Sequence, residues 1–173
     1  THKPLLSQLI DTLQHPMADA ITGRDLSDLR FNIELKYTPE WEAAGLVPDM
    51  TTFCQLVLSA IEPLTQDKIR VSLQCFHPPL LALLKAMAPE IPLVYLDEFP
   101  DQGSLDDKFN SLGFVPEIYS PYYLTLTAPE VQKAHQLGAK VIPWTVNETT
   151  EMEKLVGWGV DGIITDYPNR IPE

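Results

Sequence analysis

The sequence predicts an α/β protein in which helices cover a parallel β-sheet. Along most of the chain, segments in which apolar and polar residues alternate, as in strands, are each followed by an amphipathic helical segment. The connections from a helix to the next strand are short and often contain glycine, whereas those from a strand to the next helix are longer and more polar. This asymmetry is typical of sheets whose functional loops lie at one end. The 173 residues are enough for about one domain.

Six helices are predicted from apolar residues that recur every three or four positions. They cover residues 4–15, 49–61, 78–87, 104–112 and 127–138, and a last helix from 147 to about 157 or 159. Three of them begin with residues suited to helix starts. Asp49 and Asn147 are candidate N-caps, and Thr127 forms a capping box with Glu130. The fifth helix ends at Gly138, a residue type common just after a helix.

Six strands alternate with these helices. They cover residues 29–36, 69–76, 91–96, 117–122, 140–146 and 162–166. The first two carry polar residues on one face, because residues two positions apart in a strand point to the same side. These are Asn32, Glu34 and Lys36 in the first strand, and Arg70, Ser72 and Gln74 in the second. Burying an unpaired charge is unfavourable, so we expect the apolar faces to pack on helices and the polar faces to line a cavity.

The composition excludes several classes of partner. With 24 acidic and 12 basic residues the formal net charge is −12, which disfavours nucleic acid and anionic membranes but permits a bound divalent cation. No apolar run approaches the about 20 residues of a membrane-spanning helix. Cys54 and Cys75 are expected to be buried thiols rather than a redox pair. The four histidines lack the spacing of a metal site, and only His77 stands where a strand end meets a loop.

Three segments resemble the glycerophosphodiester phosphodiesterase family. They are FNIELK at 31–36, SLQCF at 72–76, and VIPWTVN followed by GVDGIITDYP within 141–168. The last pair is the most specific, and IYSPYY at 118–123 and AHQLGAKV at 134–141 lie where the family has similar segments. The resemblance extends from about Leu5 to the C-terminus. It implies a TIM barrel that hydrolyses glycerophosphodiesters to glycerol 3-phosphate and an alcohol, with a divalent cation, Mg²⁺ or Ca²⁺.

The resemblance also implies roles for four residues. By the family pattern, Glu34 is a metal ligand and Lys36 lies near the phosphate. Trp144 lines the substrate pocket, and Gln74 matches a glutamine of the second motif. A hard cation prefers carboxylate oxygens, and a cation with a lysine offsets the charge of a phosphodiester. Taken alone, these residues also fit a structural ion pair, a satisfied interior amide and a core aromatic residue.

The chain departs from the family pattern in two ways. Cys75 and His77 stand where the family usually has Ser and Asp. More seriously, the His-Arg-Gly strand that opens the family pattern, its Glu-Asn pair, its acidic second strand and a further catalytic His have no counterpart in this sequence. No catalytic residue is therefore assigned in this chain, and the chain alone is expected to be inactive.

Residues 1–173 are accordingly expected to form the C-terminal portion of one barrel domain. It would be a partial TIM (β/α)8 barrel with about six of eight strand–helix units and the first two strands missing. A barrel of about 250 residues has about 31 residues per unit, which gives about 5.6 units for 173 residues. Open sheet edges favour aggregation, so we expect the missing N-terminal segment or a neighbouring chain to cover them.

Two other functions stay open at this point. A related barrel phosphodiesterase of the phospholipase type is disfavoured by the paired WTVN and TDYP motifs. A non-catalytic barrel that serves as a binding module is disfavoured by the retention of Glu34, Lys36 and Trp144. The compartment is open as well, although the long segment 37–48 is more similar to exported members, periplasmic or secreted.

Overall fold

The computed structural model describes residues 5–13, 30–66 and 70–172. In these ranges five parallel strands form one sheet in the order β1-β2-β3-β4-β5. They are β1 (Arg30–Glu34), β2 (Arg70–Cys75), β3 (Leu93–Asp97), β4 (Ile118–Pro121) and β5 (Lys140–Val141). Strands that follow one another in the sequence are neighbours in the sheet, and helices connect them, as predicted for a parallel α/β protein.

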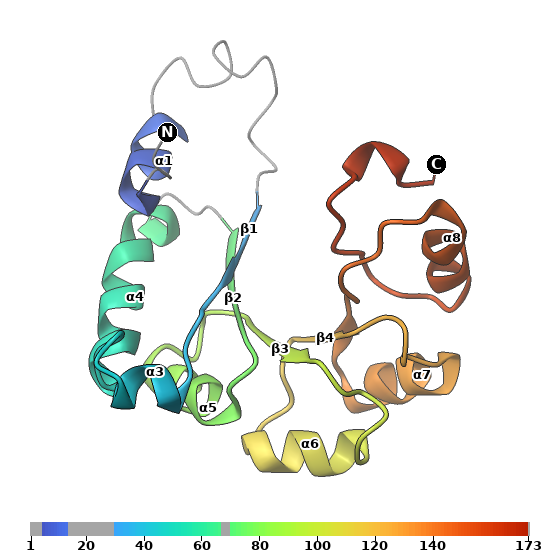
Figure 1. Ribbon diagram of the computed structural model, residues 1–173, viewed down its shortest axis with the longest axis horizontal. Coiled ribbons are helices and arrows are strands. Elements are labelled where there is room, and N and C mark those ends of the chain that lie inside the picture. The colour runs from blue at the N-terminus through green and yellow to red at the C-terminus, as the bar shows by residue number, and fades with distance from the viewer. Residues whose placement is uncertain (1–4, 14–29, 67–69, 173) are drawn as a thin grey trace.

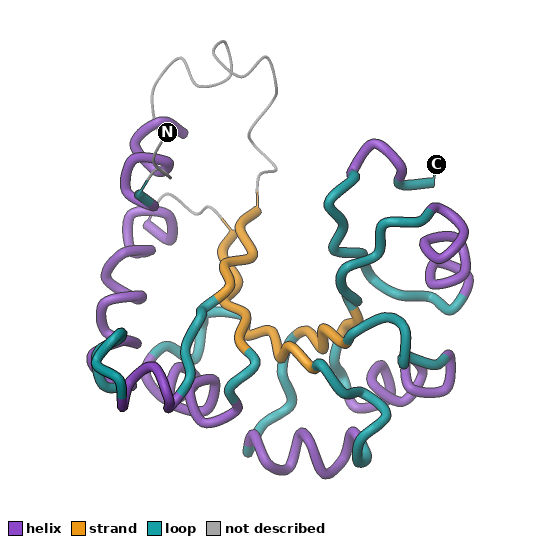
Figure 2. The backbone as a smooth tube through the Cα atoms, in the orientation of Figure 1, coloured by secondary structure: helices purple, strands orange, loops and turns teal. Residues whose placement is uncertain are grey.

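The helices lie on the outer side of the sheet, which curves so that its inner side is concave (Figures 1 and 2). They are α1 (Leu6–Leu13), α3 (Pro39–Ala43), α4 (Met50–Gln66), α5 (Pro78–Met87), α6 (Leu105–Leu112), α7 (Ala128–Leu137), α8 (Thr149–Gly157) and the 3₁₀ helix η1 (Pro168–Arg170). Strands inside and helices outside are the arrangement of a partial TIM barrel, which confirms the predicted fold class.

β2 shows how the sheet separates its two faces. Buried side chains alternate along it with more accessible ones. The buried ones, Val71, Leu73 and Cys75, belong to the hydrophobic core. Leu80 and Leu84 of α5 join the same core and are also buried. The apolar face therefore packs on helices, and the accessible residues of β2 are left for the concave side.

One ionic network is buried behind the sheet. The Asp97 carboxylate accepts hydrogen bonds from Lys108 Nζ at 2.5 Å and from the Tyr119 hydroxyl at 2.7 Å. Lys108 also donates to the Phe99 and Pro100 carbonyls, at 2.8 and 3.1 Å. Burial and the Asp97 charge raise the pKa of Tyr119 above its ordinary value, so the phenol remains a neutral donor. This network ties α6 to the loop that follows β3.

The predicted sixth strand, 162–166, is wrong, and the predicted fifth strand is reduced to Lys140–Val141. Pro143 has no N–H and cannot continue a ladder of hydrogen bonds. The two segments still lie side by side, because Val146 N–H donates to the Ile164 carbonyl and Ile164 N–H to the Pro143 carbonyl, both at 2.9 Å. The described part of the chain therefore contributes five strands rather than six.

Two helix predictions also need correction. Segment 37–48, expected to be a loop, contains α3, which starts after the N-cap Thr38 with Pro39 in its first turn. Asn147 does not cap α8; the N-cap is Glu148, and the Asn147 side chain binds Asp166 instead. α3 was missed because a helix of five residues is too short to produce a periodic apolar pattern. Asn147 was misassigned because the sequence does not distinguish a side chain that caps a helix from one that makes a tertiary contact. The predicted ends at residues 4, 14–15, 29 and 69 lie outside the described residues.

Other sequence predictions are confirmed. Asp49 Oδ1 accepts the Thr52 N–H at 3.0 Å at the start of α4. The Glu130 carboxylate accepts the Thr127 N–H at 2.9 Å, which is one half of a capping box at α7. Cys54 and Cys75 are free and buried. Within residues 5–13, 30–66 and 70–172, no helix is long and apolar enough to span a bilayer.

Candidate active site

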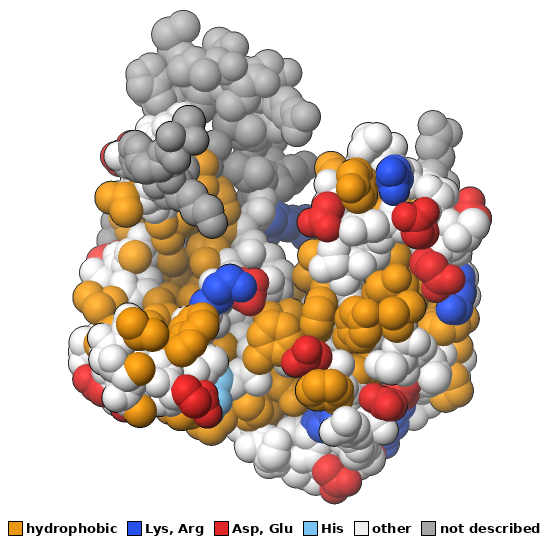
Figure 3. Space-filling view, in the orientation of Figure 1, with side chains coloured by type: hydrophobic (Ala, Val, Ile, Leu, Met, Phe, Trp, Pro, Cys, Tyr) orange, Lys and Arg blue, Asp and Glu red, His pale blue; other side chains and the backbone are white. Residues whose placement is uncertain are grey.

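The four residues that the family pattern singles out meet in one cleft. The cleft is lined by Glu34, Lys36, Gln74, Phe76, Leu96, Trp144, Thr145 and Ile164. Its volume is about 290 Å³. It lies at the carboxyl ends of β1, β2 and β3, where parallel barrels carry their active sites. On the face shown in Figure 3, hydrophobic side chains gather in the middle of the molecule, with acidic and basic groups among them.

Glu34 and Lys36 form an ion pair, with 2.9 Å between Glu34 Oε1 and Lys36 Nζ. Glu34 ends β1, and the N–H of the next residue, Leu35, donates to the Gln74 carbonyl at 2.8 Å. The Lys36 side chain is 68% exposed and the Glu34 side chain 33% exposed. A pair this accessible stabilises a fold by only about 0–1 kcal/mol. Structural stabilisation is therefore a weak explanation for these charges, and both can reach a ligand.

Gln74 lies opposite Glu34 in the register of β1 and β2. Its side-chain oxygen accepts a hydrogen bond from the Asn32 amide at 2.7 Å, and Asn32 accepts one from the Ser72 hydroxyl at 2.9 Å. This chain of hydrogen bonds fixes the Gln74 amide, and Gln74 is one of the residues that line the cleft. Asn32 is thus a positioning residue, to which the sequence assigned a face of the strand but no role.

Aromatic side chains surround Trp144. Its indole Nε1–H donates to the Ser120 carbonyl at 2.8 Å, which fixes the ring. Phe76 meets the ring edge-on, with 5.4 Å between centroids, and Tyr122 lies 5.2 Å away at a tilt of 43°. Trp144 is half-buried and forms a wall of the cleft. Phe76 and Tyr122 were not among the predicted site residues, although both stand at the ends of predicted strands, which is the signal that could have identified them.

The two most specific motifs are joined by hydrogen bonds beside the cleft. Asn147 Nδ2–H donates to the Asp166 carboxylate at 2.9 Å, and Asn147 Oδ1 accepts the Asp166 N–H at 3.0 Å. The Thr165 hydroxyl also donates to Asn147 Oδ1, at 3.2 Å. Arg170 donates to the Asn147 carbonyl at 2.9 Å. These contacts clamp the two segments together and so hold Trp144 in place.

His77 is not among the residues that line the cleft. Its ring lies 5.4 Å from that of Tyr37, at the start of α5. Partial burial lowers the pKa of His77, and the nearby Glu40 charge only partly opposes this. The imidazole therefore stays neutral near pH 7 and acts here as a packing group.

The described residues do not make a complete metal site. Mg²⁺ and Ca²⁺ take about six to eight oxygen ligands. Over residues 5–13, 30–66 and 70–172, no three Asp, Glu, His or Cys side chains come together in a group that could hold an ion. Glu34 offers one carboxylate in the cleft, and Lys36 already binds it. The remaining ligands would have to come from substrate, water or residues outside those described.

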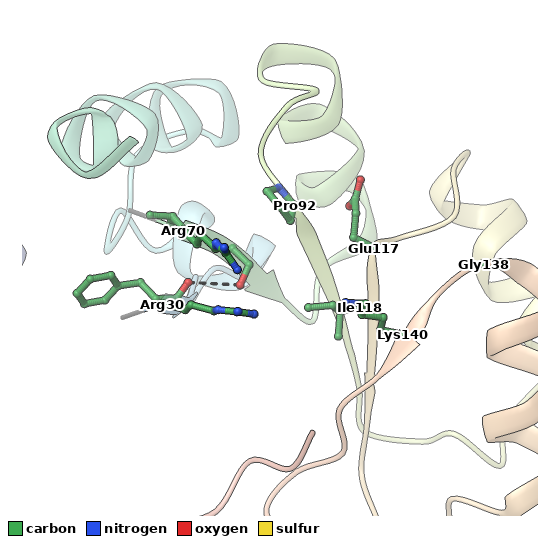
Figure 4. Close-up of a pocket in the computed structure, with 10 residues that line it drawn as sticks. Arg30, Arg70, Pro92, Glu117, Ile118, Gly138 and Lys140 are labelled. Atoms are coloured by element: carbon green, nitrogen blue, oxygen red, sulfur yellow. Dashed lines mark hydrogen bonds between the residues drawn. The ribbon is translucent and has the colours of Figure 1, made fainter. Parts of the chain in front are cut away.

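The opposite end of the sheet is basic. A cavity of about 450 Å³ at the amino ends of the strands is lined by Arg30, Arg70 and Lys140, among others. Figure 4 shows Arg30 and Arg70 extending side by side into the space that Ile118 and Lys140 border, while Glu117 points away. Arg30 lies directly opposite Arg70 in the register. Like charges on directly opposed residues destabilise a sheet, so the Arg30–Arg70 pair is expected to lower the stability of this end of the sheet.

A parallel barrel with a polar cleft at the carboxyl ends of its strands is the arrangement of TIM-barrel enzymes. Residues 9–170 match the Glycerophosphoryl diester phosphodiesterase family. The chain belongs to this family, as its motifs indicated.

Relatives match this chain over part of their own length. A glycerophosphodiester phosphodiesterase from Caldanaerobacter subterraneus subsp. tengcongensis is 30% identical over 102 residues, or 59% of this chain and 41% of that protein. The uncharacterized protein YqiK from Bacillus subtilis is 28% identical over 156 residues, or 89% of this chain and 59% of that protein. The chain thus spans about half the length of the curated relatives it matches.

Solved structures show the same pattern. A structure from Silicibacter pomeroyi assigned to the glycerophosphoryl diester phosphodiesterases has a TM-score of 0.77 at 28% identity, covering 98% of this chain and 55% of that one. An Oleispira antarctica phosphodiesterase, solved in complex with the product sn-glycerol-3-phosphate, has a TM-score of 0.62 at 22% identity, covering 81% of this chain and 52% of that one. The fold of this chain therefore corresponds to about half of such a barrel.

Proposed function

We propose that the protein to which this chain belongs hydrolyses glycerophosphodiesters to glycerol 3-phosphate and an alcohol. The observation that carries this proposal is the single cleft at the carboxyl end of the sheet, in which four residues of the family motifs meet. The Oleispira antarctica phosphodiesterase was solved with glycerol 3-phosphate as its product, which supports the same product here. Residues 1–173 would be the C-terminal portion of the barrel domain, with the first two strands supplied from outside this chain.

In this reaction the oxygen of a water molecule bonds to phosphorus. The bond from phosphorus to the alcohol oxygen breaks, and the alcohol leaves with a proton. The accessible Lys36 ammonium can contact the phosphate oxygens and offset the negative charge on them. The Gln74 amide can donate to a second oxygen of the substrate, and Trp144 offers a flat wall to the glycerol carbons.

Glu34 is proposed as one ligand of a divalent cation, Mg²⁺ or Ca²⁺. When bound, such a cation supplies positive charge that stabilises the phosphoryl oxygens during displacement. Lys36, which now lies 2.9 Å from Glu34, would then exchange the carboxylate for a phosphate oxygen. The ion pair thus keeps the lysine beside the position where the phosphodiester binds.

The 173-residue chain by itself is proposed to be inactive. Hydrolysis needs a base for the water and an acid for the leaving alcohol. The described residues that line the cleft include one carboxylate, that of Glu34, and no histidine. The acid and the base would come from strands outside this chain. The same donor set fits a non-catalytic binding module, which is the second function that the geometry supports.

The test is release of glycerol 3-phosphate by the 173-residue chain and by the longer protein, each with and without EDTA. We expect release by the longer protein that EDTA abolishes, and no release by the chain alone. Metal-independent release, or no release by the longer protein, would contradict the proposal. Binding of a glycerophosphodiester without turnover would favour the binding module.

A further inference from the structure

The basic cavity at the amino end of the sheet has no part in the proposed function. Its volume is about 450 Å³, and it shares no lining residue with the cleft at the carboxyl end. Arg30, Arg70 and Lys140 bring three positive charges to it. These residues begin β1, β2 and β5, so the charges come from both ends of the strand order.

The two arginines have no counter-charge on the described part of the protein. Neither side chain forms an ion pair or a hydrogen bond with a residue that the structure describes. Both residues are exposed, and their side chains extend side by side into the cavity (Figure 4). They also lie directly opposite each other in the register, where like charges destabilise a sheet. An anion bound between Arg30 and Arg70 would remove this repulsion.

Glu117, the one carboxylate that lines the cavity, is already engaged elsewhere. It accepts hydrogen bonds from Lys85 Nζ at 2.6 Å and from the Leu93 N–H at 2.9 Å. Figure 4 shows its side chain pointing away from the two arginines. The Lys140 charge is partly balanced, because it interacts with the Asp161 carboxylate. The two arginines are therefore the charges that a ligand has to balance.

The chemistry of these groups fits a phosphate. A guanidinium group donates two parallel hydrogen bonds to an oxyanion and matches phosphate and carboxylate in this geometry. A phosphate monoester carries close to two negative charges near neutral pH, whereas a carboxylate carries one. One phosphate therefore balances both arginines, and one carboxylate does not. Pro92 and Ile118 add apolar surface to the cavity, which suits a small organic group attached to the phosphate.

We propose that the amino-end cavity binds a small phosphorylated molecule, with its phosphate between Arg30 and Arg70 and with Lys140 as a further positive charge. This site is separate from the cleft and does not depend on the proposed hydrolysis. Bound phosphate joins the starts of β1 and β2 and offsets the repulsion between them. Binding therefore also raises the melting temperature of the protein.

Methyl phosphate and methyl sulfate test the charge requirement. The two anions have nearly the same shape, but at about pH 8 the first is mainly a dianion and the second a monoanion. Each is titrated into the longer protein and into the 173-residue chain, and binding is followed by calorimetry and by NMR shifts of backbone amides. We expect methyl phosphate to bind about tenfold more tightly, with shifts at Val71, Ile118 and Lys140. Equal affinities, no binding, or shifts confined to the residues of the cleft would overturn the proposal.

Variants locate the bound phosphate. Arg30→Gln and Arg70→Gln are each expected to weaken methyl phosphate binding about tenfold, and both should fold, because the two arginines are exposed. Lys154→Gln is the matched control, since it removes one positive charge from α8, where Lys154 pairs with Glu151. Lys36→Gln removes the cation of the cleft and should leave the shifts at the amino end unchanged. An affinity that neither arginine variant lowers, or that Lys154→Gln lowers equally, contradicts the proposal.

Comparison of the longer protein with the 173-residue chain separates a free ligand from an internal ion pair. Strands outside this chain could place an acidic side chain between Arg30 and Arg70. Methyl phosphate would then bind to the 173-residue chain but not to the longer protein, and this result would overturn the proposal. Binding to both proteins that Arg70→Gln weakens in each supports the site. None of these measurements uses hydrolysis, so the proposed function is tested independently.

Discussion

Replacing Asp97 by Asn removes a charge that is buried against Lys108. The Asp97 carboxylate lies 2.5 Å from Lys108 Nζ and 2.7 Å from the Tyr119 hydroxyl. The Lys108 side chain is only 11% exposed, so Asp97→Asn leaves its ammonium nearly dry, with the Phe99 and Pro100 carbonyls as its other partners. Removing one partner of a buried ion pair costs about 3–5 kcal/mol. For a chain of this size, the melting temperature should fall by roughly 6–20 °C.

Thermal and urea unfolding followed by circular dichroism measures this loss. Asp106→Asn is the matched control, because Asp106 also pairs with a lysine, at 2.8 Å, but with side chains 41% and 51% exposed. It should lose at most about 1 kcal/mol. Asp97→Asn combined with Lys108→Met should recover much of the stability, since the second change removes the orphaned charge. Equal losses for the Asp97 and Asp106 variants, or no recovery, would refute the argument from burial.

Three further predictions concern the cleft and the sheet. Glu34→Ala in the longer protein should lower metal affinity and the rate of hydrolysis at least about tenfold. The free energy of unfolding should fall by no more than about 1 kcal/mol, because the Glu34 side chain is 33% exposed. Metal titration, kinetics and thermal melting measure the three quantities, and a large loss of stability would favour a structural ion pair. Arg30→Glu should raise the free energy of unfolding in urea by about 0.2–1 kcal/mol, since it faces Arg70 with an opposite charge; a loss of stability would contradict this. Partial burial raises the pKa of Asp161, but hydrogen bonds from the Val141 N–H and His135 outweigh it and hold that pKa below 3.8. The resulting stabilisation is fully present above about pH 3.8 and is lost as the pH falls through the lower folded-state pKa, so Asp161→Asn should remove it from acid melting curves.

Most of the elements that build the sheet follow from local sequence patterns. β2 alternates buried and accessible side chains, and α5 begins at the Pro78-Pro79 pair, as the sequence indicates. Both signals are local, because burial on one face imposes a period on the residues of a single element. The prediction of a sixth strand was wrong for a non-local reason. The segment near Ile164 does hydrogen-bond to the segment that contains Pro143 and Val146, but Pro143 has no N–H and interrupts the ladder of hydrogen bonds.

The candidate site likewise combines features that the sequence predicts with features that only the structure shows. The sequence placed Glu34 and Gln74 on the polar faces of two neighbouring strands, and the register of the sheet then sets them opposite each other. The role of Asn147 could not, since its partner Asp166 is distant in the chain and Asn147 equally suits a helix cap. Asn32 likewise acquired its positioning role only when β1 and β2 came together.

The sequence by itself determined the family, the parallel α/β class and the residue types that carry the chemistry of the cleft, because motifs and apolar periodicity are properties of short segments. Only the tertiary structure decided that Trp144 lines two neighbouring cavities, the cleft with Glu34 and Lys36 and a second one with Glu98 and Asp101. That arrangement depends on segments that are far apart in the chain. The loop with Glu98 and Asp101 is held by the buried Asp97–Lys108 pair, and Tyr122 is brought to Trp144 by the pairing of their two segments. Packing and hydrogen bonds between elements determine such contacts, and the pattern within each element does not encode them.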